Sequence, residues 1–305
     1  MKKLYALLMI VTAIFVLTGC NNQKGTTTIE AGMKDYYVDA SWLKDNLEEV
    51  TLIDARSDKE YKAGHIEGAV NITWQALSNM AVKQGEEGWG VVLGKDALSS
   101  KLASFGIDKD QKIIIYNDPK GLGEEGRVYW MLKIAGLDDV KMLNGGITQW
   151  NKNDGKITTE ETKITASDFK IDKYDDSRIA TTDQVKAKLK TAVLLDTRSI
   201  EEYTGATNHG ENYKGEKALG RIPGAISLPY SNLYKPNGTL KSIKEIVAIM
   251  DKLGVEKDDE IITYCTVGIR SGFTAEILKM SGYKNVKNYN GSFSEWAGLG
   301  NEYEK

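Results

Sequence analysis

The sequence predicts an α/β protein of two similar domains, each a mainly parallel sheet flanked by helices. Two observations carry this prediction. An internal repeat spans most of the chain, and within each half short apolar runs alternate with stretches of helical spacing. The 305 residues suffice for about two ordinary domains. The net charge of −3 gives no reason to expect a nucleic acid as a partner.

The repeat consists of landmarks that recur in the same order. DARSDKEY at 54–61 matches DTRSIEEY at 196–203, and GHIEGA at 64–69 matches GRIPGA at 220–225. Gly106–Lys109 matches Gly254–Lys257. Asn144-Gly145 followed by Trp150 matches Asn290-Gly291 followed by Trp296. Several landmarks in fixed order are far more specific than one. We therefore expect homologous domains over 35–158 and 176–305, joined by a polar linker over 159–175, with both tryptophans as core anchors.

The elements inside each half follow from residue spacing. Apolar, β-branched runs at 50–53, 113–116, 193–195 and 261–264 suit strands buried on both faces of a parallel sheet. The segment 242–254 places apolar residues at helical spacing before Gly254, which predicts a helix that ends there. A second helix is expected over 271–280, directly after the loop that begins at Cys265.

The N-terminus reads as a targeting segment. Met1-Lys2-Lys3 is positively charged, Leu4–Leu17 is almost wholly apolar, and Leu17-Thr18-Gly19-Cys20 resembles a bacterial lipobox. The resemblance implies cleavage before Cys20 and lipidation of its thiol and new amine. We expect a signal peptide over 1–20, a flexible polar tether over 21–34, and a lipid anchor on the extracytoplasmic face of the cell membrane. The alternatives are an uncleaved anchor or a chance cysteine.

These landmarks together resemble the rhodanese family in its tandem-domain form, the thiosulfate and 3-mercaptopyruvate sulfurtransferases. The resemblance covers about residues 35–300 and implies that the C-terminal domain carries the active cysteine. The sequence departs from the family at three points, and the last two leave the substrate open. Arg221 replaces the usual histidine after Gly220, Thr266 replaces a basic residue of thiosulfate enzymes, and the loop lacks the small Gly/Ser pattern of mercaptopyruvate enzymes. An insertion over 204–219 is expected to shape the active-site entrance.

Cys265 is predicted to be the nucleophile. It follows a predicted strand and begins a loop that leads into a helix N-terminus, where backbone N–H groups and the helix dipole favour a thiolate. Gly268 permits a tight turn, and Arg270 offers a donor fork for an oxyanion such as sulfonate. The expected substrate-binding residues are Thr266, Val267, Gly268, Ile269, Arg270 and Arg198. The alternative for Cys265 is a buried small apolar side chain.

The predicted reaction is sulfur transfer from thiosulfate or a similar small anionic donor through a Cys265 persulfide to an external thiol or cyanide. It needs no cofactor or metal, and 3-mercaptopyruvate is the second donor. A non-catalytic lipoprotein that binds sulfur or a partner is the alternative. A phosphatase or arsenate reductase is disfavoured, because Cys265–Arg270 is Cys-x4-Arg, one residue shorter than the Cys-x5-Arg loop of those enzymes.

The first half is predicted to be catalytically silent. Asn117 takes the place of Cys265, and Glu124 and Glu125 would repel an anion. A Gly-x-Gly-x-x-Gly string at 121–126 is a weak dinucleotide signal in this acidic loop. We expect His65 to stabilise its turn and His209 to be solvated. Arg198 has two interpretations: substrate contact, or an ion pair with Glu202 or a neighbouring loop. Tyr230 and Tyr234 are candidates to line the cleft.

Overall fold

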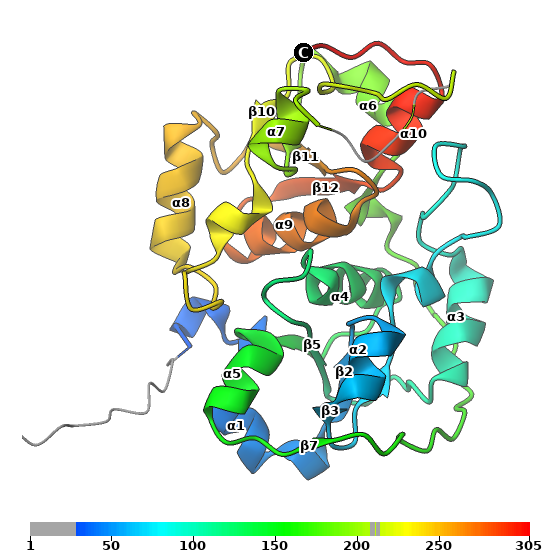
Figure 1. The fold of residues 1–305 in the computed structure, drawn as a ribbon, viewed down its shortest axis with the longest axis vertical. Helices are drawn as coiled ribbons and strands as arrows, with labels where there is room; N and C mark the ends of the chain where they lie inside the picture. Colours follow the sequence, from blue (N-terminus) through cyan, green and yellow to red (C-terminus); the bar gives the residue numbers. More distant parts are fainter. Residues whose placement is uncertain (1–28, 208–210, 212–213) are drawn as a thin grey trace, which may run out of the picture.

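The computed structural model describes residues 29–207, 211 and 214–305 and contains two α/β domains, one above the other in Figure 1. The first sheet has the order β1-β6-β5-β2-β4 and the second has the order β10-β9-β11-β12-β8; all of their strand pairs are parallel. Matched through the repeat, the two orders are the same. This confirms the predicted fold class and the internal repeat.

The bounds of the elements are as follows. The first domain contains β1 (Tyr37–Val38), α1 (Ala40–Asp45), β2 (Thr51–Asp54), α2 (Asp58–Ala63), β3 (His65–Ile66), β4 (Val70–Asn71), α3 (Lys95–Ser104), β5 (Ile113–Tyr116), α4 (Glu124–Ile134), β6 (Val140–Leu143), α5 (Gly146–Lys152) and β7 (Ile157–Thr158). The second contains β8 (Ile179–Ala180), α6 (Thr182–Lys188), β9 (Val193–Asp196), α7 (Ile200–Tyr203), β10 (Ile226–Ser227), α8 (Ile243–Lys252), β11 (Glu260–Tyr264), α9 (Ile269–Met280), β12 (Asn285–Tyr289) and α10 (Ser292–Gly298). Short 3-10 helices lie at Ala31–Met33, Leu47–Glu49, Trp74–Leu77, Asp176–Arg178 and Tyr230–Leu233.

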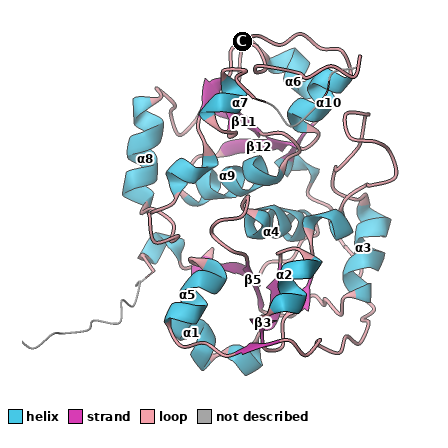
Figure 2. Ribbon diagram, in the orientation of Figure 1, coloured by secondary structure: helices cyan, strands magenta, loops and turns pink. Residues whose placement is uncertain are grey.

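Helices cover both faces of each sheet, and local sequence explains where several begin (Figure 2). Ser57, Ser199 and Ser242 each accept a hydrogen bond from the backbone N–H three residues on, and the glutamate there bonds back to the serine N–H. These capping boxes satisfy N–H groups that a helix start leaves unpaired. The helix predicted over 242–254 is α8, and Gly254 follows its end with φ +70°. Trp150 and Trp296 are buried, as predicted.

The two domains meet through α4 and α9, which lie side by side at the centre of Figure 1. Gly126 and Gly272 allow this close crossing. A Cβ built on Gly126 would lie 2.5 Å from Cδ2 of Phe273, and one on Gly272 would lie 3.3 Å from Cδ of Arg127. One cluster of buried apolar side chains runs through both domains. Apolar burial of this kind holds the domains in one arrangement.

Two predicted connecting segments place apolar side chains in the core. The tether was predicted over 21–34, but Ile29 and Met33 are buried in the core, and Glu30 accepts a hydrogen bond from the Ile243 N–H. The linker over 159–175 lacks helix or strand, yet Phe169 and Ile171 are buried in the same core. Burial of Ile29 and Met33 means that the end of the predicted tether is packed and not flexible, whereas the segment over 159–175 remains a connection that runs along the core. The predicted signal peptide, Cys20, the start of the tether and His209 lie outside the described residues.

Within the described part of the chain, the helices are too short or too polar to cross a membrane.

Candidate active site

Cys265 lies directly after β11, and the loop that it begins enters α9 at Gly268. Gly268 has φ +85°, and this left-handed conformation turns its N–H toward the sulfur: the distance from the Gly268 nitrogen to Cys265 Sγ is 3.1 Å. Cys265 is 1 % exposed. The sequence therefore places a thiol at the positive end of a twelve-residue helix, where N–H groups favour an anion.

Several groups compete to set the acidity of this thiol. Burial has the largest effect and raises the pKa of Cys265, because a buried thiolate loses its hydration. The Arg270 charge, the N–H groups of Ser271 and Val267, and the Ser271 hydroxyl act in the opposite direction, and their sum leaves the pKa below its ordinary value. Ser271 was missed in the sequence, although its place in the first turn of the helix was a usable signal.

The backbone of Cys265 is held by α10. The Cys265 N–H donates to Ser292 Oγ (3.2 Å), and the Cys265 carbonyl accepts from the Phe293 N–H (3.0 Å). Ser292 has φ +56°, which is uncommon for a residue other than glycine. Its hydroxyl also donates to the Tyr289 carbonyl (2.8 Å). The Asn-Gly landmark before α10 thus leads to a second support for the nucleophile.

Arg270 does not present an open fork, contrary to the prediction from sequence. Its Nη1 and Nη2 donate to the two carboxylate oxygens of Glu202 at 2.6 and 3.0 Å, and Nη2 also donates to Thr266 Oγ1 at 2.7 Å. Burial raises the pKa of Glu202, but the bonds and charge of Arg270 outweigh it and lower that pKa to about 2. The pair stays ionised at neutral pH and ties the loop to α7. The sequence offered Glu202 as a partner of Arg198, and its pairing with Arg270 was missed because the two residues are far apart along the chain.

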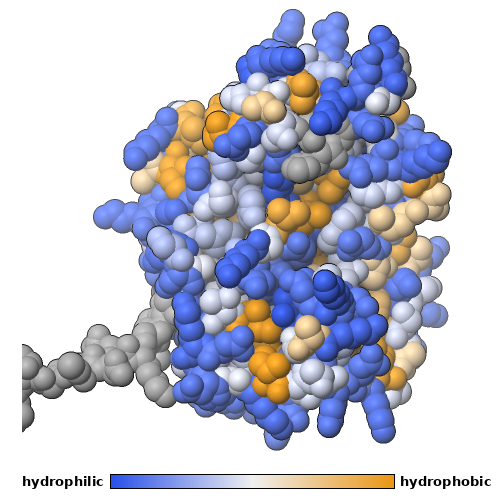
Figure 3. Space-filling model, in the orientation of Figure 1, coloured by the Kyte–Doolittle hydropathy of each residue, from blue (hydrophilic) through white to orange (hydrophobic). Residues whose placement is uncertain are grey.

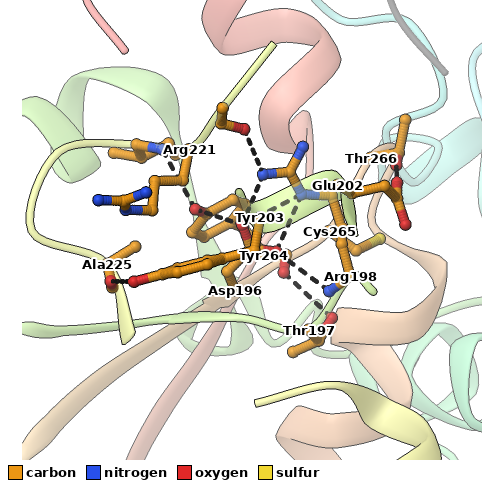
Figure 4. Close-up of polar contacts among 12 residues, drawn as sticks. Asp196, Thr197, Arg198, Glu202, Tyr203, Arg221, Ala225, Tyr264, Cys265 and Thr266 are labelled. Atoms are coloured by element: carbon orange, nitrogen blue, oxygen red, sulfur yellow. Dashed lines mark hydrogen bonds and ion pairs between the residues drawn. The ribbon is translucent and has the colours of Figure 1, made fainter. Parts of the chain in front are cut away.

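Arg198 does not line the Cys265 pocket, and its contacts favour the ion-pair interpretation over substrate contact. The residue is 0 % exposed. Its Nη2 donates to Asp196 Oδ2 (2.5 Å) and to the Gly220 carbonyl (2.7 Å), as Figure 4 illustrates for the Asp196 network. The same arrangement recurs around Asp54 and Arg56 in the first domain. A pair present in both domains serves the fold. The partner is Asp196 and not Glu202.

A pocket of about 230 Å³ opens onto Cys265. The loop that begins at Cys265 supplies part of its wall through Thr266, Val267, Ile269 and Arg270, and the first domain supplies Gln84, Trp89 and Leu122. In Figure 3, apolar side chains gather in the middle of the molecule, near the junction of α4 and α9. The described residues of the insertion at 204–219 do not line this pocket, and part of its wall comes from the first domain.

The loop of the first domain that corresponds to the Cys265 loop carries acidic side chains near its Asn117. Asn117 Nδ2 donates to Glu124 Oε2 (2.7 Å) and Glu125 Oε2 (3.0 Å). Burial, reinforced by the charge of Glu124, raises the pKa of Glu125 to about 7. Tyr234 donates to Glu125 Oε1 across the interface, and Tyr230 donates to the Gly121 carbonyl. Neither tyrosine lines the Cys265 pocket, and both join the two domains.

The predictions for His65 and for metal binding concern other parts of the chain than the Cys265 pocket. His65 is buried, its Nδ1 lies 2.8 Å from the Tyr61 carbonyl oxygen, and its ring stacks on the Tyr61 ring. These contacts join α2 to the following turn. Among the described residues, no group of three or more His, Cys, Asp or Glu side chains is arranged to hold a metal ion.

The lowered pKa of Cys265 predicts that its alkylation begins at a lower pH than that of an unstructured thiol. The rate of reaction with iodoacetamide follows the thiolate fraction, so its midpoint should lie below that of an unstructured thiol. The measurement is the alkylation rate against pH, with the urea-unfolded protein as reference. A folded midpoint at or above the unfolded one would contradict this assignment.

Replacing Gly268 by alanine is expected to slow alkylation strongly and to destabilise the protein. The new Cβ would lie 2.6 Å from the Asn290 carbonyl oxygen and 3.0 Å from Arg127 Nη1. Gly254→Ala is the matched control, since Gly254 also has positive φ but open space around it. The control should cost about 1–2 kcal/mol of unfolding free energy from left-handed strain and keep normal alkylation. Equal alkylation rates in both variants would refute the prediction.

Comparison with known proteins places these features in context. The family model described as rhodanese-like domain matches residues 39–153 and again 181–299. The sulfur carrier protein TtuD of Thermus thermophilus is 32% identical over 277 residues, 86% of this chain and 93% of that protein. A putative thiosulfate sulfurtransferase of Mycolicibacterium smegmatis is 30% identical over 272 residues, 87% of this chain and 95% of that protein.

The fold likeness extends to a solved structure. The anaerobic ergothioneine biosynthesis enzyme of Chlorobium limicola, in complex with its natural substrate trimethyl histidine, superposes with a TM-score of 0.76 at 22% identity. The match covers 89% of this chain and 70% of that one. At this identity the likeness concerns the fold.

Proposed function

Because the chain belongs to the rhodanese family of sulfurtransferases, we propose that Cys265 accepts a sulfane sulfur from thiosulfate or a similar small donor and passes it to an external thiol. The observation that carries this proposal is the Cys265 thiol at the start of α9, with a lowered pKa and the Gly268 N–H on its sulfur. A thiolate at a helix N-terminus that accepts a backbone N–H is both a nucleophile and, once sulfurated, a stabilised anion.

The proposed chemistry has two balanced steps. The Cys265 thiolate attacks the outer sulfur of thiosulfate; the new S–S bond forms as the bond to the sulfonate sulfur breaks, and sulfite leaves with that electron pair. An acceptor thiolate then attacks the terminal sulfur of the persulfide. The acceptor leaves as its own persulfide, and Cys265 returns as a thiolate. Two steps through a covalent intermediate predict ping-pong kinetics.

We expect the donor to be bound through backbone N–H groups of the loop more than through a free cation. Arg270 lines the pocket, but Glu202 neutralises much of its charge. The donor therefore stays open between thiosulfate, the first choice, and 3-mercaptopyruvate. Steady-state turnover with each donor, using cyanide as acceptor, tests the proposal. Turnover that depends on Cys265 supports it, whereas no turnover with either donor favours a non-catalytic sulfur or partner-binding protein.

We also propose that the protein is anchored to the extracytoplasmic face of the cell membrane through lipidated Cys20. The support is the order of charge, apolar run and Leu17–Cys20 motif in the sequence. In a host that processes lipoproteins, Cys20→Ala is expected to prevent incorporation of labelled palmitate and to abolish membrane anchoring. Equal palmitate labelling of both forms would contradict the proposal.

A further inference from the structure

Arg127 is a buried residue of the first domain that reaches the catalytic loop of the second. It lies on α4 and is 0 % exposed. Its Nη1 donates to the Gly268 carbonyl (3.1 Å), and its Nη2 donates to the Asn290 side-chain oxygen (2.6 Å) and the Gly90 carbonyl (2.9 Å). Gly268 and Asn290 flank the Cys265 loop and α10. One guanidinium therefore joins both supports of the nucleophile.

The charge of Arg127 has no carboxylate partner among the described residues. Its three acceptors are neutral, its Nε lacks a hydrogen-bond partner in the described structure, and its guanidinium lies over the Trp130 ring at 4.6 Å. Burial is the largest influence and lowers the pKa of Arg127 to about 9, while the negative charge of the Cys265 thiolate acts to raise it. Arg127 is thus mostly charged at neutral pH, and a buried charge without a counter-ion is unfavourable.

Gly268 connects this charge to the thiolate. Its N–H points at Cys265 Sγ, and its carbonyl accepts from Arg127. The other charged side chains around the thiol are Arg270 on α9 and its partner Glu202 on α7. The Tyr174 phenol also faces Arg127, and its pKa is raised by burial and by Asp176. Of these groups, Arg127 is the cation that lacks an acidic partner in the described structure.

The repeat shows that this contact is asymmetric. When Gly126 is matched with Gly272, the residue that corresponds to Arg127 is Phe273. Phe273 packs over Gly123 and Gly126 of the silent domain, as Arg127 packs over Gly268 and Gly272 of the catalytic domain. Phe273 stacks on Tyr234 and brings no charge to the silent loop. Of these two corresponding residues, the charged one, Arg127, thus contacts the loop that carries Cys265.

We propose that Arg127 is a positioning residue which the silent domain contributes to the active site: it holds the Gly268 turn and places a fixed positive charge beside the Cys265 thiolate and its persulfide. The claim that the charge lies beside the thiolate stands on the geometry alone. The claim that it also acts on the persulfide rests on the proposed function. The first domain would then contribute directly to the chemistry of the second domain.

The test is the pH dependence of Cys265 alkylation in the full chain, since it needs no sulfur donor and stays informative if the proposed function fails. Arg127→Gln removes the charge and keeps hydrogen-bond donors, Arg127→Lys keeps the charge, and Lys133→Met removes a different cation from α4 as the control. A rise of one pKa unit lowers the thiolate fraction about tenfold below the midpoint. We therefore expect the alkylation rate of Arg127→Gln at neutral pH to fall about tenfold. The rates of Arg127→Lys and Lys133→Met should be largely retained.

Circular dichroism and urea unfolding establish that each variant is folded. A folded Arg127→Gln protein with the wild-type alkylation midpoint would overturn the proposal. If that variant does not fold, Asn290→Asp provides the second test, because it leaves Arg127 in place and gives it a carboxylate partner at the oxygen it already contacts. A raised thiol midpoint in Asn290→Asp then supports the proposal, and an unchanged midpoint overturns it.

Discussion

Replacing Cys265 by serine is expected to lower sulfur transfer by at least about 10³-fold, because a serine hydroxyl cannot form the persulfide on which both steps depend. The pocket residues do not offer a substitute nucleophile with a thiol, since Cys265 is the free cysteine of the described structure. Turnover with thiosulfate and cyanide, measured at saturating concentrations, is the readout.

The serine variant should otherwise resemble the wild type. The Cys265 backbone contacts to Ser292 and Phe293 involve no thiol atom, so its urea midpoint is expected to change little. A folded serine variant that keeps turnover within about tenfold of the wild type would exclude covalent catalysis by Cys265.

Replacing Asp196 by alanine is expected to cost about 3–5 kcal/mol of unfolding free energy, because it leaves the buried Arg198 charge unpaired. Both residues are 0 % exposed, and the Tyr264 hydroxyl would lose its acceptor on Asp196 as well. Urea unfolding measures the loss. A change below about 1 kcal/mol would show that the buried pair contributes little.

Asp54→Ala in the first domain is the matched control for this variant. Asp54 holds Arg56 and the Tyr116 hydroxyl in the same geometry. We expect a similar loss of stability from both variants. Under conditions where both are folded, slower Cys265 alkylation is expected in Asp196→Ala alone, since Asp196 lies near the catalytic loop. Equal effects on alkylation would show that the network acts on the whole fold and not on the site.

Much of the fold could be predicted because it depends on local patterns. The four apolar runs became β2, β5, β9 and β11, and the segment after Ser242 became α8. The repeat predicted that both domains would share one architecture, and the two sheets have matching strand orders. Short runs of β-branched residues between turns carry this information in the sequence itself.

The active-site contacts were harder to predict because they join residues distant in sequence. Arg270 pairs with Glu202, 68 positions away, and Arg127 meets Gly268 across 141 positions. Spacing along the chain cannot reveal such pairs. For Arg198 the sequence held a usable signal for the ion-pair interpretation, since Asp54 and Arg56 repeat the motif in a domain that has asparagine at the position of Cys265. A motif present with and without the cysteine is more consistent with a structural role.

Intact mass spectrometry before and after incubation with a sulfane donor tests the central claim most directly. The wild-type protein is expected to gain one sulfur atom, to lose it on treatment with cyanide, and to show no such gain in Cys265→Ser. Thiosulfate and 3-mercaptopyruvate are to be tried in turn. A wild-type protein whose Cys265 is alkylated readily but gains no sulfur from either donor would contradict the account of Cys265 as a sulfur carrier.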